Sequence, residues 1–329
     1  MTLCIAWIRQ HGTEQELVIA TDSRLTGGES WDYGVKLFEL PRQDCLLCFA
    51  GGTERAYPLI LNTITSIKFD KYLASPYTDI HNILEYLTDL FTALVQEIKE
   101  SVEPIHEARG LAQFLFGGWS WKNQQFGIWR LYYEPALGAF THESIDPGRA
   151  RVFTFIGDHI EDAQKLLMEK FGGIDRLLSS PLDMEPLQVL AEMSRRDTDY
   201  SSIGGALQVA KVYRSGTSEF FGVMWPSLAG QPTFLGRPFP DHDLPSVRLI
   251  DPDTASLIED SLPENLTLTE IDEELYGNEF EFVLDCYPEG QLKPDLSEKK
   301  QKRLMKAIHG AAYKKYCADQ ATPLELIDA

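Results

Sequence analysis

The chain has 329 residues, of which 43% are hydrophobic, so it can bury a large core. Fifty acidic side chains against thirty basic ones give a formal net charge of −20. Such a surface repels the phosphates of nucleic acids and anionic membranes. We therefore expect neither nucleic acid nor a membrane among its partners.

The sequence also indicates where the protein works. No apolar run reaches the roughly 18 residues that a membrane span needs, and the N-terminus lacks the basic-then-apolar layout of a secretory signal. The five cysteines are an odd number scattered along a long chain, which argues against a disulfide framework. Cys45 and Cys48 form a C-x-x-C pair within a predicted strand. Side chains three positions apart in a strand point to opposite faces of the sheet. We expect a cytoplasmic protein.

The first fifty residues predict two pairs of strands. Residues 2–9 and 16–25 are rich in apolar and β-branched side chains, and the polar segment 10–15 between them predicts a hairpin. Residues 33–40 and 44–52 form a second pair around a turn that contains proline and aspartate. The chain therefore begins inside a sheet.

The remaining pattern alternates blocks of helices and strands. Apolar residues recur every three or four positions from Leu59 to Ile98, which predicts two amphipathic helices. Strands are predicted within 112–158, helices over 160–171 and 182–196, and strands over 206–214 and 218–225. Segregated blocks of this kind favour an α+β fold, with two antiparallel sheets packed on each other and a helix pair on each outer face. This is a four-layer αββα sandwich.

The character of the chain changes near residue 236. An acidic, proline-containing segment follows, and residues 298–317 then predict a basic helix. We therefore predict a first domain over residues 1–235 and a C-terminal extension over 236–329. The extension is either of low order or packed on itself or on a neighbouring subunit.

Thr2 is a candidate nucleophile, because its side chain is small enough for Met1 to be removed. The freed α-amine, with an ordinary pKa of about 7.7 to 8.0, is partly neutral and lies within reach of its own Oγ, so one residue supplies nucleophile and base. A nearby lysine lowers the pKa of that amine by repulsion, and Lys36 lies in an apolar strand with Asp22 as its matching carboxylate. Taken singly, Asp22 is an ordinary strand-end turn former and Lys36 an edge-strand charge.

Four motifs occur together and in order. They are Thr2 with its strand at 2–6, A-T-D-S-R-L-T at 20–26, V-K-L-F-E-L at 35–40 and F-A-G-G at 49–52. In these motifs the chain resembles the proteasome β-subunit family, including the bacterial HslV peptidase, and the resemblance extends over roughly residues 2 to 225. It implies an N-terminal nucleophile (Ntn) hydrolase of the threonine peptidase type.

The resemblance also implies roles for single residues. Thr2 is the nucleophile, Asp22 and Lys36 form the charge network, and the N–H of Gly51 faces the developing oxyanion. Asp158 stands where the family usually has a serine that bonds the catalytic amine, and as an anion it would raise the pKa of that amine. Asp199 and Ser202 correspond to a D-x-x-S-G-G segment that has one inserted residue here. The implied substrate pocket contains Ser23, Gly34, Phe49 and Thr53.

The resemblance implies a hydrolase that cleaves peptide bonds inside a homo-oligomeric ring or double ring, together with an ATP-dependent unfoldase. No cofactor or metal is expected, because the seven histidines show no metal-like spacing and the phosphate-loop and zinc motifs are missing. Three alternatives stay open. They are an amide hydrolase that does not act on peptides, a catalytically silent structural subunit, and a regulatory protein that binds through the acidic extension.

Overall fold

The computed structural model describes residues 2–27, 29–99, 104–145, 152–196, 199–239, 247–258, 273–288 and 292–321. The chain divides into two compact units. One comprises Met1–Gly222 with Phe234–Arg237, and the other comprises Val223–Thr233 with Pro238–Ala329. The boundary at residue 235 stays a prediction, and each unit is described by itself.

The first sheet of unit 1 is antiparallel and begins with the N-terminal strand. Within unit 1 this nine-stranded sheet has the spatial order β10 (Phe153–Gly157), β1 (Leu3–His11), β2 (Glu14–Thr21), β11 (Gln208–Val212) and the first part of β12 (Ser218–Trp225). β1 therefore pairs on both sides. Its neighbour on one side is the hairpin partner β2, and its neighbour on the other side is β10, which lies far along the chain. Pairing on both sides fixes the start of β1.

The second sheet is a meander in which neighbours in sequence pair antiparallel. It runs β5 (Leu37–Glu39), β6 (Cys45–Gly51), β7 (Ala112–Ser120), β8 (Gln125–Glu134) and β9 (Ala139–Ser144). A separate hairpin, β3 (Leu25–Thr26) with β4 (Ser30–Trp31), lies between β2 and β5 in the chain. The predicted α+β class with antiparallel sheets is confirmed.

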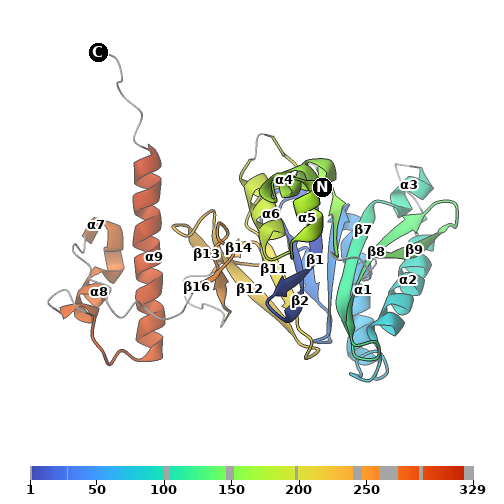
Figure 1. The fold of residues 1–329 in the computed structure, drawn as a ribbon, viewed down its shortest axis with the longest axis horizontal. Helices are drawn as coiled ribbons and strands as arrows, with labels where there is room; N and C mark the ends of the chain where they lie inside the picture. The colour runs from blue at the N-terminus through green and yellow to red at the C-terminus, as the bar shows by residue number, and fades with distance from the viewer. Residues whose placement is uncertain are drawn as a thin grey trace, which may run out of the picture. The chain divides into compact units, whose positions relative to one another are not determined.

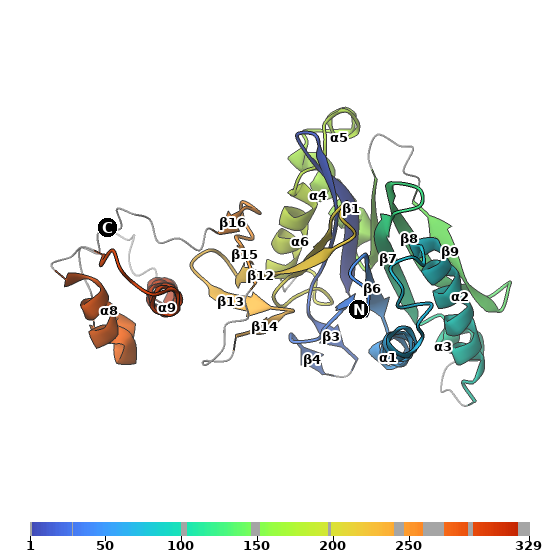
Figure 2. The ribbon, with the colours of Figure 1, turned by 90° about the horizontal axis from the view of Figure 1, so that it is seen from below.

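Helices cover each sheet (Figures 1 and 2). α1 (Thr53–Phe69) packs on β6 and β7, and α2 (Ile80–Gln96) packs on β7 and β9. On the first sheet, α6 (Glu185–Arg195) contacts β1 and β2, and α4 (Ile160–Lys170) contacts β10. Two short helices, α3 (Ile105–Arg109) and α5 (Ile174–Ser179), complete unit 1.

The two sheets share a core. One buried apolar cluster combines Cys4 and Ile19 of the first sheet with Cys48 and Leu115 of the second. Cys45 instead belongs to the cluster that the second sheet forms with α1 and α2. The prediction that the two cysteines of the C-x-x-C pair face opposite sides of their strand is therefore confirmed.

Unit 2 contains short strands and a small helical core. Its described elements include most of β13 (Gln231–Phe234), the end of β14 (Arg237–Pro238), β15 (Leu249–Ile250), β16 (Leu257–Ile258), α7 (Glu273–Tyr276), η1 (Gly277–Glu279), α8 (Phe280–Cys286) and α9 (Glu298–Ala321). Val283 and Cys286 of α8 pack against Leu304 of α9 in a buried cluster. The predicted basic helix is α9, and the described part of the extension is ordered. Among the described residues, no helix is long and apolar enough to cross a membrane.

Candidate active site

A buried ion pair forms the centre of the site. The Lys36 Nζ donates to both carboxylate oxygens of Asp22 at 3.0 Å, and both side chains are fully buried. Burying two charges is costly unless further hydrogen bonds satisfy them. The Asp22 carboxylate meets that condition, because it also accepts from the backbone N–H groups of Leu3, Arg24 and Gly204 at 3.0–3.1 Å.

These contacts join four distant segments of the chain. Asp22 directly follows β2, Lys36 directly precedes β5, and Leu3 is the first residue of β1. Gly204 belongs to the loop before β11, in the D-x-x-S-G-G-like segment. The two motif residues that the sequence analysis paired are therefore brought together, and their carboxylate and ammonium fix the start of the N-terminal strand.

Gln208 is a buried residue of the site that the sequence analysis missed. Its Oε1 accepts from the backbone N–H groups of Lys36 and Leu37 at 3.0 and 3.1 Å, and its Nε2 donates to the Gly34 carbonyl at 2.6 Å. One fully buried amide thus holds the segment that presents Lys36. Its sequence signal is a polar amide within a predicted strand, which does not show which partners that amide will meet.

Thr2 lies at the edge of this network. Its carbonyl accepts from the Asp158 N–H at 2.8 Å, while Leu3 pairs with Gly157 of β10 in the sheet register. A Cβ on Gly157, where φ is +107°, would lie 1.9 Å from the Thr2 carbonyl oxygen. Only glycine allows β10 and the first residues of β1 to approach so closely.

Gly51 ends β6 beside the start of β1. The preceding Ala50 is in contact distance of Gly157, whose hypothetical Cβ lies 3.2 Å from the Ala50 Cβ. The fold itself requires glycine at position 51, because φ is +106° and a Cβ would lie 2.0 Å from the Leu111 carbonyl oxygen. The role of its N–H toward an oxyanion stays a prediction.

Two polar atoms of the predicted site are buried without a hydrogen-bond partner among the described residues. They are Oδ2 of Asp158 and Oγ of Ser202. Unpaired buried polar atoms are rare in folded proteins, and each requires an explanation. Asp199, by contrast, is exposed, and its N–H donates to the Arg196 carbonyl. The catalytic roles of these three residues stay predictions.

The four predicted pocket residues are connected to the Asp22–Lys36 network. Some are joined to it by hydrogen bonds, and others lie near its residues in the sequence. The Ser23 N–H donates to the Gly204 carbonyl, and the Ser23 carbonyl accepts from the Gly34 N–H. The Gly34 carbonyl also accepts from Gln208. Thr53 is the first residue of α1, directly after the Gly51–Gly52 turn. Phe49 is fully buried, so its ring lies within the core.

Phe49 packs against aromatic neighbours. Its ring centroid lies 6.3 Å from that of Phe38 and 5.6 Å from that of Tyr57. The Tyr57 hydroxyl donates to the Val35 carbonyl next to Lys36. The assignment of these positions to a substrate pocket stays a prediction.

Two buried thiols adjoin the network. The Cys4 Sγ donates to the Phe49 carbonyl at 3.0 Å. Burial, followed by a hydrogen bond with Cys4, raises the pKa of the Cys48 thiol well above its ordinary value. Because the thiolate is the reactive form of cysteine, Cys48 is protonated and unreactive near neutral pH.

Comparison with known proteins finds similarity only in structure. No family model and no curated protein matches the chain. Anbu structures are similar to it. An Anbu (Gly-1) mutant from Hyphomicrobium sp. strain MC1 is 18% identical over 67% of this chain and 87% of that chain, with a TM-score of 0.45. Anbu from Yersinia bercovieri, described as an ancestral β-subunit, is 16% identical over 66% and 86%, also with a TM-score of 0.45.

A third similar structure is the helical assembly of the Anbu complex from Pseudomonas aeruginosa, at 15% identity over 67% and 85% and a TM-score of 0.48. The expected membership of the proteasome β-subunit and HslV-like family is therefore wrong. The similar structures are Anbu proteins, which are related to that family by fold. Identities and TM-scores this low carry no argument about activity, so the functional argument depends on the geometry of the site.

Proposed function

We propose that the protein is an N-terminal threonine hydrolase that cleaves peptide bonds after Met1 is removed. The observation that carries this proposal is the buried Asp22–Lys36 pair, whose Asp22 carboxylate also binds the N–H of Leu3, the residue next to Thr2. Lys36 is fully buried and reaches the Leu3 N–H through the Asp22 carboxylate. An apolar side chain would pack at this position better than a lysine, so packing alone does not explain the cation.

In the proposed mechanism the Thr2 α-amine takes the proton from its own Oγ, and Oγ attacks the scissile carbonyl carbon. The positive charge of Lys36 favours the neutral, basic form of that amine. The amine becomes an ammonium group, and we assign Asp158 Oδ2 and Ser202 Oγ as acceptors for its protons, because both are buried without a partner among the described residues. The Gly51 N–H stabilises the oxyanion.

The ammonium group then donates a proton to the nitrogen of the scissile bond. The C–N bond breaks, the amine product departs, and the acyl group remains on Thr2 Oγ as an ester. The neutral α-amine then takes a proton from water, whose oxygen attacks the ester carbonyl. The acyl–Oγ bond breaks, the acyl group leaves as a carboxylic acid, and the amine returns the proton to Oγ, so protons balance over the cycle. This scheme needs neither a metal nor a cofactor. We further propose that unit 1 is a four-layer αββα sandwich of the Ntn-hydrolase type, since both outer sheet faces carry helices and the inner faces share a core.

We propose that the protein works in the cytoplasm as a homo-oligomeric ring or double ring, with a polypeptide substrate and an ATP-dependent unfoldase as partners. Exposed aromatic side chains support self-association, because the α1–α2 loop presents Tyr72 at 61% and Tyr77 at 84% exposure. A helical assembly, as described for the Anbu complex of P. aeruginosa, is the alternative arrangement.

One observation favours a second candidate, a catalytically silent subunit. Thr2 is only 2% exposed, so its Oγ is not open to a substrate carbonyl in this structure. Retention of Met1 in the purified protein would support this candidate.

Hydrolysis assays test the proposal. Fluorogenic peptides and small amides are offered to the wild type, Thr2→Ala and Thr2→Ser. We expect peptide cleavage by the wild type, weaker cleavage by Thr2→Ser and none by Thr2→Ala. Cleavage of small amides alone would move the assignment to an amide hydrolase, and equal turnover by wild type and Thr2→Ala would refute a threonine mechanism.

A further inference from the structure

A hollow lies in unit 1, at the opposite end of β6 from Gly51. Its volume is about 540 Å³, and loops from four parts of the chain line it: the β5–β6 connection, the α1–α2 connection, the β7–β8 turn and the β11–β12 hairpin. β6 separates this hollow from Gly51 by roughly 20 Å, given a rise of about 3.3 Å per residue. It is therefore distinct from the Thr2 site.

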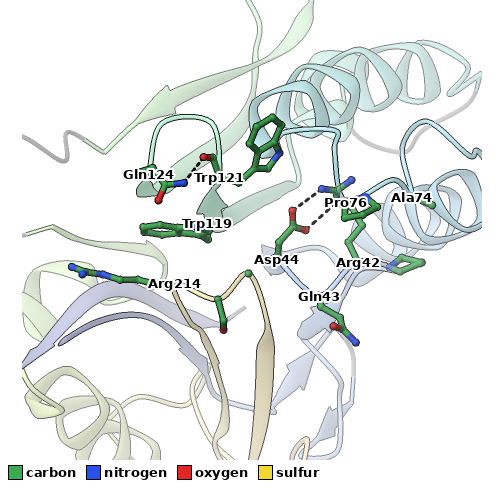
Figure 3. A pocket seen from close by; sticks show the side chains of 12 residues that line it. Arg42, Gln43, Asp44, Ala74, Pro76, Trp119, Trp121, Gln124 and Arg214 are labelled. Atoms are coloured by element: carbon green, nitrogen blue, oxygen red, sulfur yellow. Dashed lines mark hydrogen bonds and ion pairs between the residues drawn. The ribbon is translucent and has the colours of Figure 1, made fainter.

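One wall of the hollow is fixed by Arg42 (Figure 3). The guanidinium pairs with both Asp44 carboxylate oxygens and donates to the carbonyls of Leu73, Ser75 and Thr78. This arrangement ties the α1–α2 loop to the β5–β6 connection and satisfies the charge of Arg42 completely.

The opposite wall is held by a second buried network. Ser120 Oγ and the Lys122 N–H both donate to Asp79 Oδ2, at 2.8 and 3.2 Å. These bonds fix the end of β7, which carries Trp119, and the β7–β8 turn, which carries Trp121. A hollow whose walls are built this firmly costs little to organise when a ligand binds.

The lining offers two indole rings and one net positive charge. Trp119 is nearly buried, whereas Trp121 is 45% exposed. Arg42 and Asp44 neutralise each other, which leaves Arg214 as the uncompensated formal charge of the lining. Within the described part of the chain, Arg214 bonds only the neutral Gln15 side chain, at 2.9 Å. A positively charged aromatic hollow is unusual on a chain of net charge −20.

We infer that this hollow binds an aromatic carboxylate, with the ring against Trp119 and Trp121 and the carboxylate on Arg214. Indole faces stack on aromatic rings, and a guanidinium binds a carboxylate through two parallel hydrogen bonds. The volume falls within the roughly 300–1,000 Å³ of small-molecule sites. The ligand is either a free aromatic acid or the aromatic C-terminal residue of a peptide, since both present the same chemistry.

Calorimetric titration with three probes tests this inference. N-acetyltryptophan carries the carboxylate, N-acetyltryptophanamide is its neutral counterpart, and the peptide Gly-Gly-Gly-Trp presents the same group at a chain end. We expect the acid to bind about tenfold more tightly than the amide. Tighter binding of the peptide than of the free acid would identify a peptide terminus as the ligand, and the reverse would identify a free acid.

Variants locate the binding. Arg214→Gln should abolish the preference for the acid over the amide, and Trp121→Ala should weaken binding of both. The matched controls Arg196→Gln and Trp31→Ala make the same changes at exposed positions outside the hollow and should leave all affinities unchanged. All four side chains lie at least partly in solvent, so the variants should fold. Equal binding of acid and amide by the wild type, or an unaltered preference in Arg214→Gln, would overturn the inference.

Discussion

At the scale of single residues, the Asp22–Lys36 pair dominates the energetics of the site. Both side chains are fully buried, and the carboxylate accepts three backbone N–H groups in addition to the ammonium. Replacing a buried pair with apolar residues is often tolerated, whereas removing one partner leaves an uncompensated charge. The pair therefore contributes most when its two members are present together.

Lys36→Met should lower the free energy of unfolding by about 3–5 kcal/mol, because it leaves the Asp22 carboxylate buried without its cation. The double variant Asp22→Asn/Lys36→Met should recover part of this loss. Urea unfolding of the wild type, both single variants and the double variant gives the coupling free energy. Additive losses, with no recovery in the double variant, would mean that the two groups do not interact energetically.

The sequence was sufficient to identify the Asp22–Lys36 pair, but it did not identify Gln208, which holds the backbone at Lys36. Asp22 and Lys36 stand in short motifs with distinctive neighbours, and the structure joins them as predicted. Gln208 bonds Lys36 across 172 positions of the chain. An amide in a strand carries no local signal of the partners it will meet, and so this residue became visible only in three dimensions.

At the scale of elements, periodicity located the long helices and strands of unit 1. α1, α2, α4 and α6 lie where apolar spacing predicted them. The strand predicted over 33–40 is observed only over Leu37–Glu39, because the preceding backbone bonds the Gln208 side chain in place of a neighbouring strand. The short elements β3, β4 and α5 were missed, since they hold too few residues to show a period.

The junction of β10 with the start of β1 gives a prediction about glycine. Gly157→Ala should destabilise the protein by several kcal/mol, because a Cβ would collide with the Thr2 carbonyl and φ is positive. Gly138→Ala is the matched control, since φ is +64° there and a Cβ would meet nothing within 4 Å. Its cost should be about 1 kcal/mol. Thermal unfolding of both variants measures the difference, and equal losses would show that β10 can move away from Thr2.

The N-terminus of α2 gives a prediction about pH. Burial opposes ionisation of Asp79, but bonds from His81, Ser120 and Lys122 outweigh it and hold the pKa of this carboxyl below its ordinary value. A lowered pKa in the folded state stabilises the protein above the unfolded pKa of about 3.9, and this contribution is lost as pH falls through the folded pKa.

Asp79→Ala should therefore cost about 2 kcal/mol of unfolding free energy at pH 7, because a helix cap and two buried hydrogen bonds are removed. The difference from the wild type should shrink at pH 3. Asp175→Ala, an exposed position in α5, serves as the control and should have little effect at either pH. A cost for Asp79→Ala that is the same at both pH values would contradict the lowered pKa.

At the scale of the whole molecule, net charge opposes the assembly that we propose. Each chain carries a formal charge of −20, so subunits repel one another until salt screens them. If the protein associates as we propose, raising the salt from 50 to 500 mM should shift the population toward larger oligomers. Mass photometry at the two concentrations measures this shift. Dissociation at high salt would show that ion pairs, and not apolar contacts, hold the subunits together.

The sequence predicted the structure of unit 2 less well than that of unit 1. The acidic character of the extension suggested low order as one alternative, yet Val283, Cys286 and Leu304 form a small buried core. Only the basic helix was predicted from this part of the chain. Short apolar stretches do not reveal which distant helix will cover them, so their packing could not be derived from the sequence.

We propose that Thr2, once Met1 is removed, is the nucleophile. Intact-protein mass spectrometry before and after incubation with a threonine-directed epoxyketone tests it most directly, with the wild type and Thr2→Ala compared. We predict a protein that lacks Met1 and gains the mass of one inhibitor, and no gain in Thr2→Ala. Retained Met1 without an adduct, or an equal adduct on Thr2→Ala, would contradict the claim.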